Sequence, residues 1–269
     1  SVLMMENKVV TKKVLERAGI SVPGGYEYTS PEAGMADYRL YAGKPVVIKP
    51  KSTNFGLGIT ILKHNYDETD FKAALQIAFE HDNTVLIEKF IPGREFRIFI
   101  INDEVVGILH RVPANVTGDG VLNIGQLIDR KNEDPLRGKG YRTPLEKIRK
   151  GREEEMFLKQ QGMDFNTVPK EREVVYLREN SNISTGGDSI DFTDDIDDSY
   201  KAIAVEAAKA LNVKITGLDM MIQDIHAPAT PDNYAIIEMN FNPAIHIHCY
   251  PFKGKNRHLN HKMIKALGF

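Results

Sequence analysis

Two apolar stretches near the C-terminal end each contain one carboxylate, and this pattern restricts the fold more than any other feature. Asp219 lies within I-T-G-L-D-M-M-I, and Glu238 lies within A-I-I-E-M-N. Both stretches have the composition of buried strands, and residues 226–233, with two prolines, predict a hairpin loop between them. A carboxylate inside a buried strand costs free energy unless it is paired or binds a metal. We therefore expect a hairpin in which the two acids share one polar site.

The residue types around this hairpin predict a hard-metal site. Side chains alternate along a strand, so Glu238 and Asn240 point to the same face, and Asp219 can lie beside them on the neighbouring strand. Two carboxylates and an amide oxygen suit Mg²⁺ that is held jointly with phosphate oxygens. The alternative, in which both acids pair with buried arginines, ranks below the metal site.

A competing soft-metal site would use His246, His248 and Cys249, just beyond the second strand. These residues supply at most three ligands, whereas a structural zinc site needs about four in a tetrahedral array. The chain has only one cysteine, so no second thiolate can complete the set. We interpret the three residues as groups that pack or orient other residues near the predicted binding cleft.

The charge balance and the single cysteine exclude several classes of protein. Lys plus Arg total 35 and Asp plus Glu total 37, and no dense basic run is present, so no nucleic-acid partner is predicted. One cysteine permits no intramolecular disulfide, and the N-terminus is not signal-like, which indicates a cytoplasmic setting. No apolar run approaches the roughly 18 residues of a membrane span. The abrupt opening S-V-L-M-M-E-N-K indicates a piece of a longer protein.

The hydrophobic periodicity predicts an α+β chain of one large domain or two lobes around a shared cleft. Asn102-Asp103 is typical of the two-residue turn of a β-hairpin. Helices are expected at residues 6–18, 67–80, 145–161 and 199–211, with a short helix closing the chain. Strands are expected at residues 45–50, 58–62, 85–88, 95–101, 104–111, 172–178, 216–223 and 234–239.

A glycine-containing loop follows the strand that ends in Lys49. Glycines let backbone N–H groups approach phosphates closely, and Lys49 would supply the compensating charge. The segment is neither a Walker A loop nor a dinucleotide-binding fingerprint. Taken alone, an ordinary glycine-containing hairpin explains it equally well. The residues of interest in the loop are Ser52, Thr53, Gly56 and Gly58.

A strand crossover at residues 85–100 offers a second binding element. One strand ends at Glu88, a linker crosses at residues 90–93, and a new strand begins with Glu95 and Arg97. The crossover exposes backbone groups that can read the edge of a purine, and Glu95 could accept hydrogen bonds from ribose hydroxyls. In isolation, an ordinary linker with surface charges is the favoured interpretation.

The loop R-E-N-S-N-I-S-T-G-G-D-S, residues 178–189, offers a cation, amides, hydroxyls and two glycines. This combination suits a polar, amino-acid-like ligand, and a plain surface turn is the alternative. Arg97 and Arg111, on facing strands of the 95–111 hairpin, could add positive charge towards the same cleft.

Taken in this order, the motifs resemble the ATP-grasp ligases over nearly the whole chain. The resemblance rests on the lysine-ended strand, the glycine-rich loop, the E-K-x-x-x-G-x-E pattern that begins at Glu88, and the Asp…Glu-x-Asn set. Within that family, residues 112–120, 180–191 and 238–248 resemble cyanophycin synthetases and the C-terminal half of bifunctional glutamate–cysteine ligase/glutathione synthetases. The ending H-C-Y-P-F-K-G-K-N-R-H-L-N favours the latter.

The resemblance implies a single ATP-grasp domain over residues 1–269, in which an N-terminal lobe, 1–87, and a C-terminal lobe, 88–269, sandwich ATP. The implied ATP-binding residues are Lys13, Lys49, Ser52, Thr53, Gly56, Gly58, Glu88, Lys89, Ile91 and Glu95. Asp219, Glu238 and Asn240 are the implied ligands of two Mg²⁺ ions, which Mn²⁺ could replace. Arg97, Arg111, Arg178 and Asn242 are the implied catalytic residues, and Asn180, Ser184, Thr185, Gly186 and Gly187 the implied substrate-binding residues.

The implied reaction joins γ-glutamylcysteine to glycine through an acylphosphate and gives glutathione, ADP and phosphate. An upstream glutamate–cysteine ligase domain is expected in the full-length chain, and the resemblance leaves a homodimer open. Alternatives are a cyanophycin-type or D-alanine-type ligase, or an ATP-binding module without turnover. One departure from the family concerns Gly217, because many of its peptide ligases place an arginine two residues before the first metal aspartate. Arg111 or Arg178 would then meet the transition-state charge.

Overall fold

The computed structural model describes residues 5, 7–52, 58–63, 65–140 and 142–268, which form two structural units. The first unit comprises residues 1–95 and 197–242, and the second comprises residues 96–196 and 243–269. The chain therefore leaves the first unit and returns to it, whereas the sequence analysis placed one boundary between residues 87 and 88. That assignment of lobes stays a prediction.

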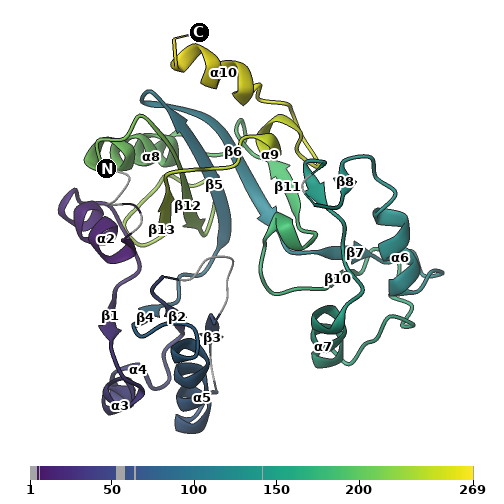
Figure 1. Ribbon diagram of the computed structural model, residues 1–269, viewed down its shortest axis with the longest axis horizontal. Coiled ribbons are helices and arrows are strands. Elements are labelled where there is room, and N and C mark those ends of the chain that lie inside the picture. Colours follow the sequence, from purple (N-terminus) through teal and green to yellow (C-terminus); the bar gives the residue numbers. More distant parts are fainter. Residues whose placement is uncertain (1–4, 6, 53–57, 64, 141, 269) are drawn as a thin grey trace. The chain divides into compact units, whose positions relative to one another are not determined.

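A four-stranded antiparallel sheet forms the first part of unit one (Figure 1). Its strands lie in the order β1-β4-β2-β3, and Phe71 and Leu75 of helix α5 pack fully buried against them. Asp67 and Asp70 form a capping box that begins α5. The bounds are β1 Gly25–Tyr28, β2 Val46–Pro50, β3 Thr60–Leu62, β4 Val85–Lys89, α3 Pro31–Ala36, α4 Tyr38–Tyr41 and α5 Glu68–Phe79.

The second part of unit one is the predicted C-terminal hairpin with two helices. The hairpin consists of β12 (Ile215–Ile222) and β13 (Tyr234–Asn240), and the helices are α2 (Lys8–Arg17) and α8 (Asp198–Ala210). Helix α2 packs against β13 and α8. Its N-cap is Asn7, whose side chain accepts hydrogen bonds from two backbone N–H groups of the first turn.

Unit two contains the predicted hairpin of residues 95–111 except for its first residue, Glu95. Strands β5 (Arg94–Ile101) and β6 (Glu104–Val112) are joined at Asn102 and Asp103, whose φ angles of 47° and 65° match a type I′ turn. Strand β11 (Asp188–Asp191) pairs antiparallel with β6. Helices α9 (His246–Cys249) and α10 (Leu259–Ala266) complete this part of the unit.

The remainder of unit two surrounds a separate small core that includes Ile124, Ile128, Leu158 and Leu177. The predicted helix at residues 145–161 is shorter than expected, because residues 145–146 form a strand and Gly151 is the helix N-cap. The elements are β7 Asn115–Thr117, α6 Ile124–Lys131, β8 Arg137–Gly138, β9 Leu145–Glu146, α7 Arg152–Gln160, β10 Val174–Tyr176 and the 3₁₀ turn η1 Ile183–Thr185.

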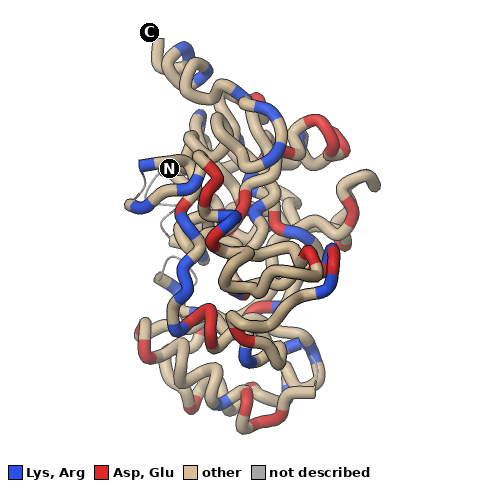
Figure 2. Tube along the Cα trace, turned by 90° about the vertical axis from the view of Figure 1, so that its right-hand side faces the viewer, with Lys and Arg blue, Asp and Glu red and all other residues tan. Residues whose placement is uncertain are grey.

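The surface charges are mixed in sign. Figure 2 shows acidic and basic residues interleaved along the chain trace, in keeping with the near-neutral net charge of −2. Across the described segments, no helix combines the length and the apolarity that crossing a bilayer requires.

Candidate active site

The two carboxylates of the C-terminal hairpin face each other. Asp219 on β12 is directly opposite Glu238 on β13, and a register shift follows between Asp219 and Met220. Residues directly opposite in an antiparallel pair project from the same face of the sheet. Asp219 is 5% exposed and the Glu238 side chain is 31% exposed, so the two acids meet at a partly buried position, where directly opposed like charges are destabilising.

Asn240 extends this acidic pair along the same face. It is two residues beyond Glu238, and its partner across the hairpin is Gly217, which contributes no side chain there. The Nδ2 atom of Asn240 is buried and makes no hydrogen bond. Since amide oxygen and nitrogen exchange places on rotation, the side chain can present its oxygen instead. Two carboxylates and an amide oxygen on one face fit a divalent cation that completes its shell from phosphate and water.

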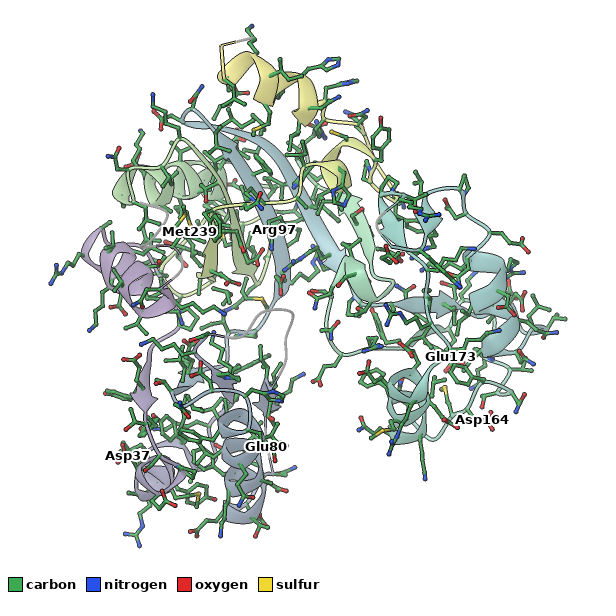
Figure 3. All side chains as sticks on the ribbon, viewed as in Figure 1. Asp37, Glu80, Arg97, Asp164, Glu173 and Met239 are labelled. Carbon is green, nitrogen blue, oxygen red and sulfur yellow. The ribbon has the colours of Figure 1, made fainter. Side chains whose placement is uncertain are left out.

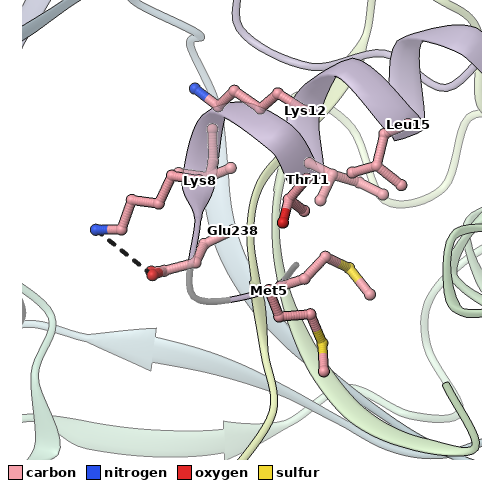
Figure 4. Close-up of a pocket in the computed structure, with 9 residues that line it drawn as sticks. Met5, Lys8, Thr11, Lys12, Leu15 and Glu238 are labelled. Carbon is pink, nitrogen blue, oxygen red and sulfur yellow. Dashed lines mark ion pairs between the residues drawn. The ribbon is translucent and has the colours of Figure 1, made fainter. Parts of the chain in front are cut away.

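A lysine of helix α2 meets this site. Lys8 Nζ lies 3.5 Å from a carboxylate oxygen of Glu238, and the pair lines a pocket with Met5, Thr11 and Leu15 (Figure 4). The hairpin therefore carries its acids against a helix that supplies positive charge.

A second charge cluster lies within unit one around Glu88, which is 4% exposed. Lys49 Nζ is 2.8 Å from one oxygen of Glu88, and Lys12 of α2 pairs with the other oxygen. Burial and the nearby charge of Lys49 lower the pKa of Lys12 to about 8. Burial alone would raise the pKa of Glu88, but the two lysines outweigh it and lower that pKa. Two cations around one carboxylate leave a local excess of positive charge.

The predicted ATP-binding residues differ in their surroundings, and two of them are not described by the structure. Ser52 donates its backbone N–H to Asp82 at 2.7 Å, and Gly58 has a φ of 73°. Thr53 and Gly56 lie outside the described residues. Lys13 is exposed on α2, one residue after the lysine that contacts Glu88.

The predicted adenine and ribose contacts lie at the end of β4, in the linker after it and at the start of β5. Lys89 is exposed, whereas Ile91 and Glu95 are half-buried. The backbone N–H of Lys89 donates to Gly24 and that of Phe90 donates to Pro45, so these two groups already have acceptors. A purine edge would be read by the backbone beyond them.

Two predicted catalytic arginines share a face in unit two. Arg97 is opposite Leu109, two residues before Arg111, so the side chains of both arginines project from the same side of the hairpin. Arg97 is half-buried and is labelled on β5 in Figure 3. Arg111 is opposite Ser189, within the strand that follows the predicted substrate loop.

Arg178 has acidic neighbours within unit two. Its Nε donates to Glu154 at 2.6 Å, and its guanidinium also pairs with Glu153. Both acids lie in the first turn of α7. Both of these charged contacts of Arg178 are therefore with acids of α7.

The fourth predicted catalytic residue, Asn242, lies in unit one and is exposed.

The predicted substrate loop is a defined turn. Thr185 donates to Asn180 Oδ1 at 3.1 Å, and Gly186 has a φ of 94°, which glycine adopts readily. The backbone N–H of Gly187 donates to Asn182 at 3.1 Å. Ser184 lies within the 3₁₀ turn between these contacts.

The histidines and the cysteine do not converge on one point. His246 is exposed, whereas His248 is fully buried with its ring against the edge of Phe99. The thiol of Cys249 lies 3.7 Å from Asn260 Oδ1. In the described part of the chain, no group of three or more His, Cys, Asp or Glu is placed to hold a metal ion.

Comparisons with known proteins give the family. Residues 27–123 match the family described as D-ala D-ala ligase C-terminus. The chain is 62% identical over 269 residues to the glutathione biosynthesis bifunctional protein GshAB of Desulfotalea psychrophila, covering all of this chain and 34% of that protein. A bifunctional glutathione synthetase from Pasteurella multocida superposes with a TM-score of 0.76 at 49% identity, over 99% of this chain and 37% of that one.

The fold itself is also shared with more distant enzymes. The ATP-grasp ligase PsnB superposes with a TM-score of 0.54 at 16% identity, over 99% of this chain and 60% of that one. The chain belongs to the ATP-grasp ligase family. Its α+β fold is the ATP-grasp fold predicted from the sequence, and the family implies use of ATP and a divalent metal. The chain spans about a third of the length of the bifunctional relatives it matches.

Two lysines of this ATP-grasp chain were missed by the sequence analysis. Lys8 contacts the candidate metal ligand Glu238, and Lys12 contacts Glu88. They are four residues apart in α2 and therefore lie on the same side of the helix. This spacing is visible in the sequence, but nothing in the sequence says which strand that side of the helix covers.

Proposed function

We propose that the chain catalyses the ATP-dependent ligation of γ-glutamylcysteine to glycine, giving glutathione, ADP and phosphate. The names of the relatives support this, since they describe glutathione biosynthesis and glutathione synthetase. The identity of 62% is measured over all 269 residues of the chain. We also propose an upstream domain that forms γ-glutamylcysteine, because the relatives are bifunctional and about three times as long.

The observation that carries the proposal is the Asp219–Glu238 pair with Asn240 beside it. A partly buried pair of like charges is unfavourable in isolation and becomes favourable when a cation binds both acids. We propose two Mg²⁺ ions there, with Mn²⁺ as a substitute. When bound, the metal would neutralise phosphate oxygens as the γ-phosphoryl group is transferred.

The lysines around Glu88 would hold the triphosphate. Lys49 sits at the end of β2, and Lys12 reaches the same carboxylate from α2, so the side chain of Glu88 fixes the direction of both ammonium groups. Their charge exceeds that of Glu88 by one and would attract α- and β-phosphates. Positioning of this kind, rather than covalent chemistry, supplies most of the catalysis in phosphoryl transfer.

Unit two would hold the peptide and neutralise its developing charge. The carboxylate of the cysteinyl residue of γ-glutamylcysteine attacks the γ-phosphorus of ATP, the bond to ADP breaks, and an acylphosphate forms. The amine of glycine then attacks the acyl carbon, and phosphate leaves. Arg97 and Arg111, which share a face of the hairpin, would balance the acylphosphate charge. Arg111 would also meet the transition-state charge in place of the arginine that is absent at Gly217. Asn180 and the turn at residues 184–187 would bind the peptide.

ADP release decides between this function and its alternatives. The purified protein is assayed with ATP, Mg²⁺, γ-glutamylcysteine and glycine, and then with each component omitted in turn. We expect ADP formation only when γ-glutamylcysteine and glycine are both present. Equal rates without either substrate would overturn the glutathione assignment. D-alanine as the sole amino acid is the matched alternative, because residues 27–123 match the D-ala D-ala ligase family.

A further inference from the structure

A buried charge cluster in unit two has no role in the mechanism above. It consists of Asn115, Lys131, Arg137, Asp188 and Phe252, and we call it the loop clamp. Arg137 and Asp188 are each 4% exposed and form an ion pair. Lys131 Nζ pairs with the other oxygen of Asp188 at 2.7 Å. The members come from α6, β7, β8, β11 and the segment after α9, so the cluster ties five separate stretches of unit two together.

The loop clamp leaves no free donor on its lysine. Lys131 Nζ donates to the backbone oxygen of Asn115 at 2.9 Å, to its Oδ1 at 3.1 Å and to Asp188, which uses all three N–H groups. The ring of Phe252 covers both cations, with its centroid 5.1 Å from Lys131 Nζ and 5.4 Å from the Arg137 guanidinium. Lys131 therefore has no N–H group left for a ligand. The Nε atom of Arg137 is buried without a hydrogen-bond partner, and every other polar contact of the two cations is with a protein group.

The groups held by Arg137 belong to the predicted substrate loop, to β11 after it and to β9. The Nη1 atom of Arg137 donates to the backbone oxygen of Gly186 at 3.0 Å and to that of Glu146 at 2.8 Å. The same guanidinium binds Asp188, two residues after Gly186. One rigid, planar side chain thus fixes both ends of the segment at residues 186–188 relative to β9.

The backbone around Gly186 is held by local hydrogen bonds of the turn and by the contact with Arg137. Gly186 is left-handed, and a Cβ there would lie 2.8 Å from the Cα of Ile148, so the turn is tightly apposed to the chain next to β9. A glycine pair has many accessible conformations and loses much entropy when it is ordered. Burying an arginine beside it is itself costly, which is consistent with a task other than stability.

We propose that Arg137 is a positioning residue for peptide binding, which sets the conformation of the Asn182–Gly187 turn through the Gly186 carbonyl. The proposal rests on the proposed function, in which this turn holds γ-glutamylcysteine. Arg137, to which the sequence analysis gave no function, thereby acquires a part in substrate affinity.

The test replaces the guanidinium by a single ammonium group. In Arg137→Lys the charge remains, but one nitrogen cannot reach Gly186, Glu146 and Asp188 together. Arg130→Met is the matched control, because Arg130 also lies next to the clamp in sequence but pairs with Asp119 at the surface. The KM for γ-glutamylcysteine, the KM for ATP and the hydrogen exchange of the Gly186 and Gly187 amides are measured for each protein.

In Arg137→Lys we expect the KM for γ-glutamylcysteine to rise about tenfold or more while the KM for ATP stays within about twofold, because a displaced binding group penalises only its own substrate. The two glycine amides should exchange faster, and Arg130→Met should match the wild type. An unchanged peptide KM, an equal rise in both KM values, or unchanged exchange of these amides would overturn the proposal.

Failure of the proposed function gives a different pattern. If the wild-type protein forms no ADP with γ-glutamylcysteine and glycine, the function is wrong, and the peptide-binding role of Arg137 falls with it; the exchange of the glycine amides still reports whether the clamp orders the turn. If Arg137→Lys does not fold, Asp188→Asn, which preserves the shape of the side chain, is measured in the same way and judged by the same outcomes.

Discussion

Glu238 lies directly opposite Asp219 in the antiparallel hairpin, and Lys8 Nζ approaches Glu238 to 3.5 Å. This arrangement places two carboxylates on one face of neighbouring strands at a position where Asp219 is almost completely buried. Carboxylates directly opposite each other repel, and a divalent cation that binds both acids would remove that repulsion. Binding of a metal and stability of the hairpin are therefore linked.

Replacing Glu238 tests that link. In Glu238→Gln we expect near-complete loss of Mg²⁺-dependent ADP formation with the fold retained, since the amide keeps the size of the side chain and removes its charge. Mg²⁺ or Mn²⁺ should raise the melting temperature of the wild type and leave that of Glu238→Gln unchanged, because only the wild type binds the ion. Glu206→Gln is the control, as Glu206 pairs with Lys209 on the surface of α8. Normal turnover by Glu238→Gln would show that the metal ligands are assigned wrongly.

The lysines of α2 can be separated by paired substitutions. Lys12 contacts Glu88 beside Lys49, whereas Lys13, the residue predicted from the sequence, is exposed. We expect Lys12→Met to weaken ATP binding about tenfold, as loss of one charge-assisted contact costs on the order of 1.5 kcal/mol. Lys13→Met should bind ATP like the wild type. Titration calorimetry with ATP measures both, and a larger loss in Lys13→Met would restore the assignment made from the sequence.

Much of the fold was predictable because its strands and helices have regular apolar spacing. The hairpin turn at Asn102-Asp103, helix α8 and the strand pair β12–β13 were each predicted within about two residues. The predictions were incomplete where elements are very short or are stabilised only by tertiary contacts. Strands β8 and β9 have two residues each, and no periodicity can be read from two residues.

The pairing of the candidate site residues could be predicted where an unusual residue type stands within one stretch of sequence. Asp219 and Glu238 stand out because acids are expensive in apolar strands. Lys12 and Arg137 leave no such mark, since a lysine on an amphipathic helix and an arginine in a charged region look like surface residues. Only the tertiary structure shows that Lys12 meets Glu88 and that Arg137 is buried.

The buried His248 makes stability depend on pH. Burial lowers its pKa to about 3, below the ordinary value of 6.5, so the unfolded chain binds this proton more readily than the folded one. The stability contributed by neutral His248 is present above pH 6.5 and is lost as the pH falls towards 3. At pH 5 the loss amounts to roughly 2 kcal/mol, from 1.5 pH units at about 1.4 kcal/mol each.

Urea unfolding at pH 7.5 and pH 5 measures this loss. In His248→Leu the drop in unfolding free energy between the two pH values should be smaller than in the wild type by about that amount. His226→Leu is the control, because His226 is exposed. The prediction is wrong if His248→Leu and the wild type lose the same stability over this range.

Two glycines with positive φ separate backbone strain from steric contact in the predicted substrate loop. Gly186 (φ 94°) would place a Cβ 2.8 Å from Ile148, whereas Gly162 (φ 71°), which follows α7, has no neighbouring atom within 4 Å of that position. Both alanine variants are destabilised by the left-handed backbone, but only in Gly186→Ala does the Cβ also clash with a neighbouring chain segment. We therefore expect Gly186→Ala to lower the free energy of unfolding by about 1–3 kcal/mol more than Gly162→Ala, the usual cost of overpacking.

The KM of Gly186→Ala for γ-glutamylcysteine should also rise, while Gly162→Ala should keep the wild-type KM. Urea unfolding and steady-state kinetics measure the two effects, and equal destabilisation with unchanged KM values would show that the turn next to Ile148 neither packs as tightly nor binds the peptide as proposed.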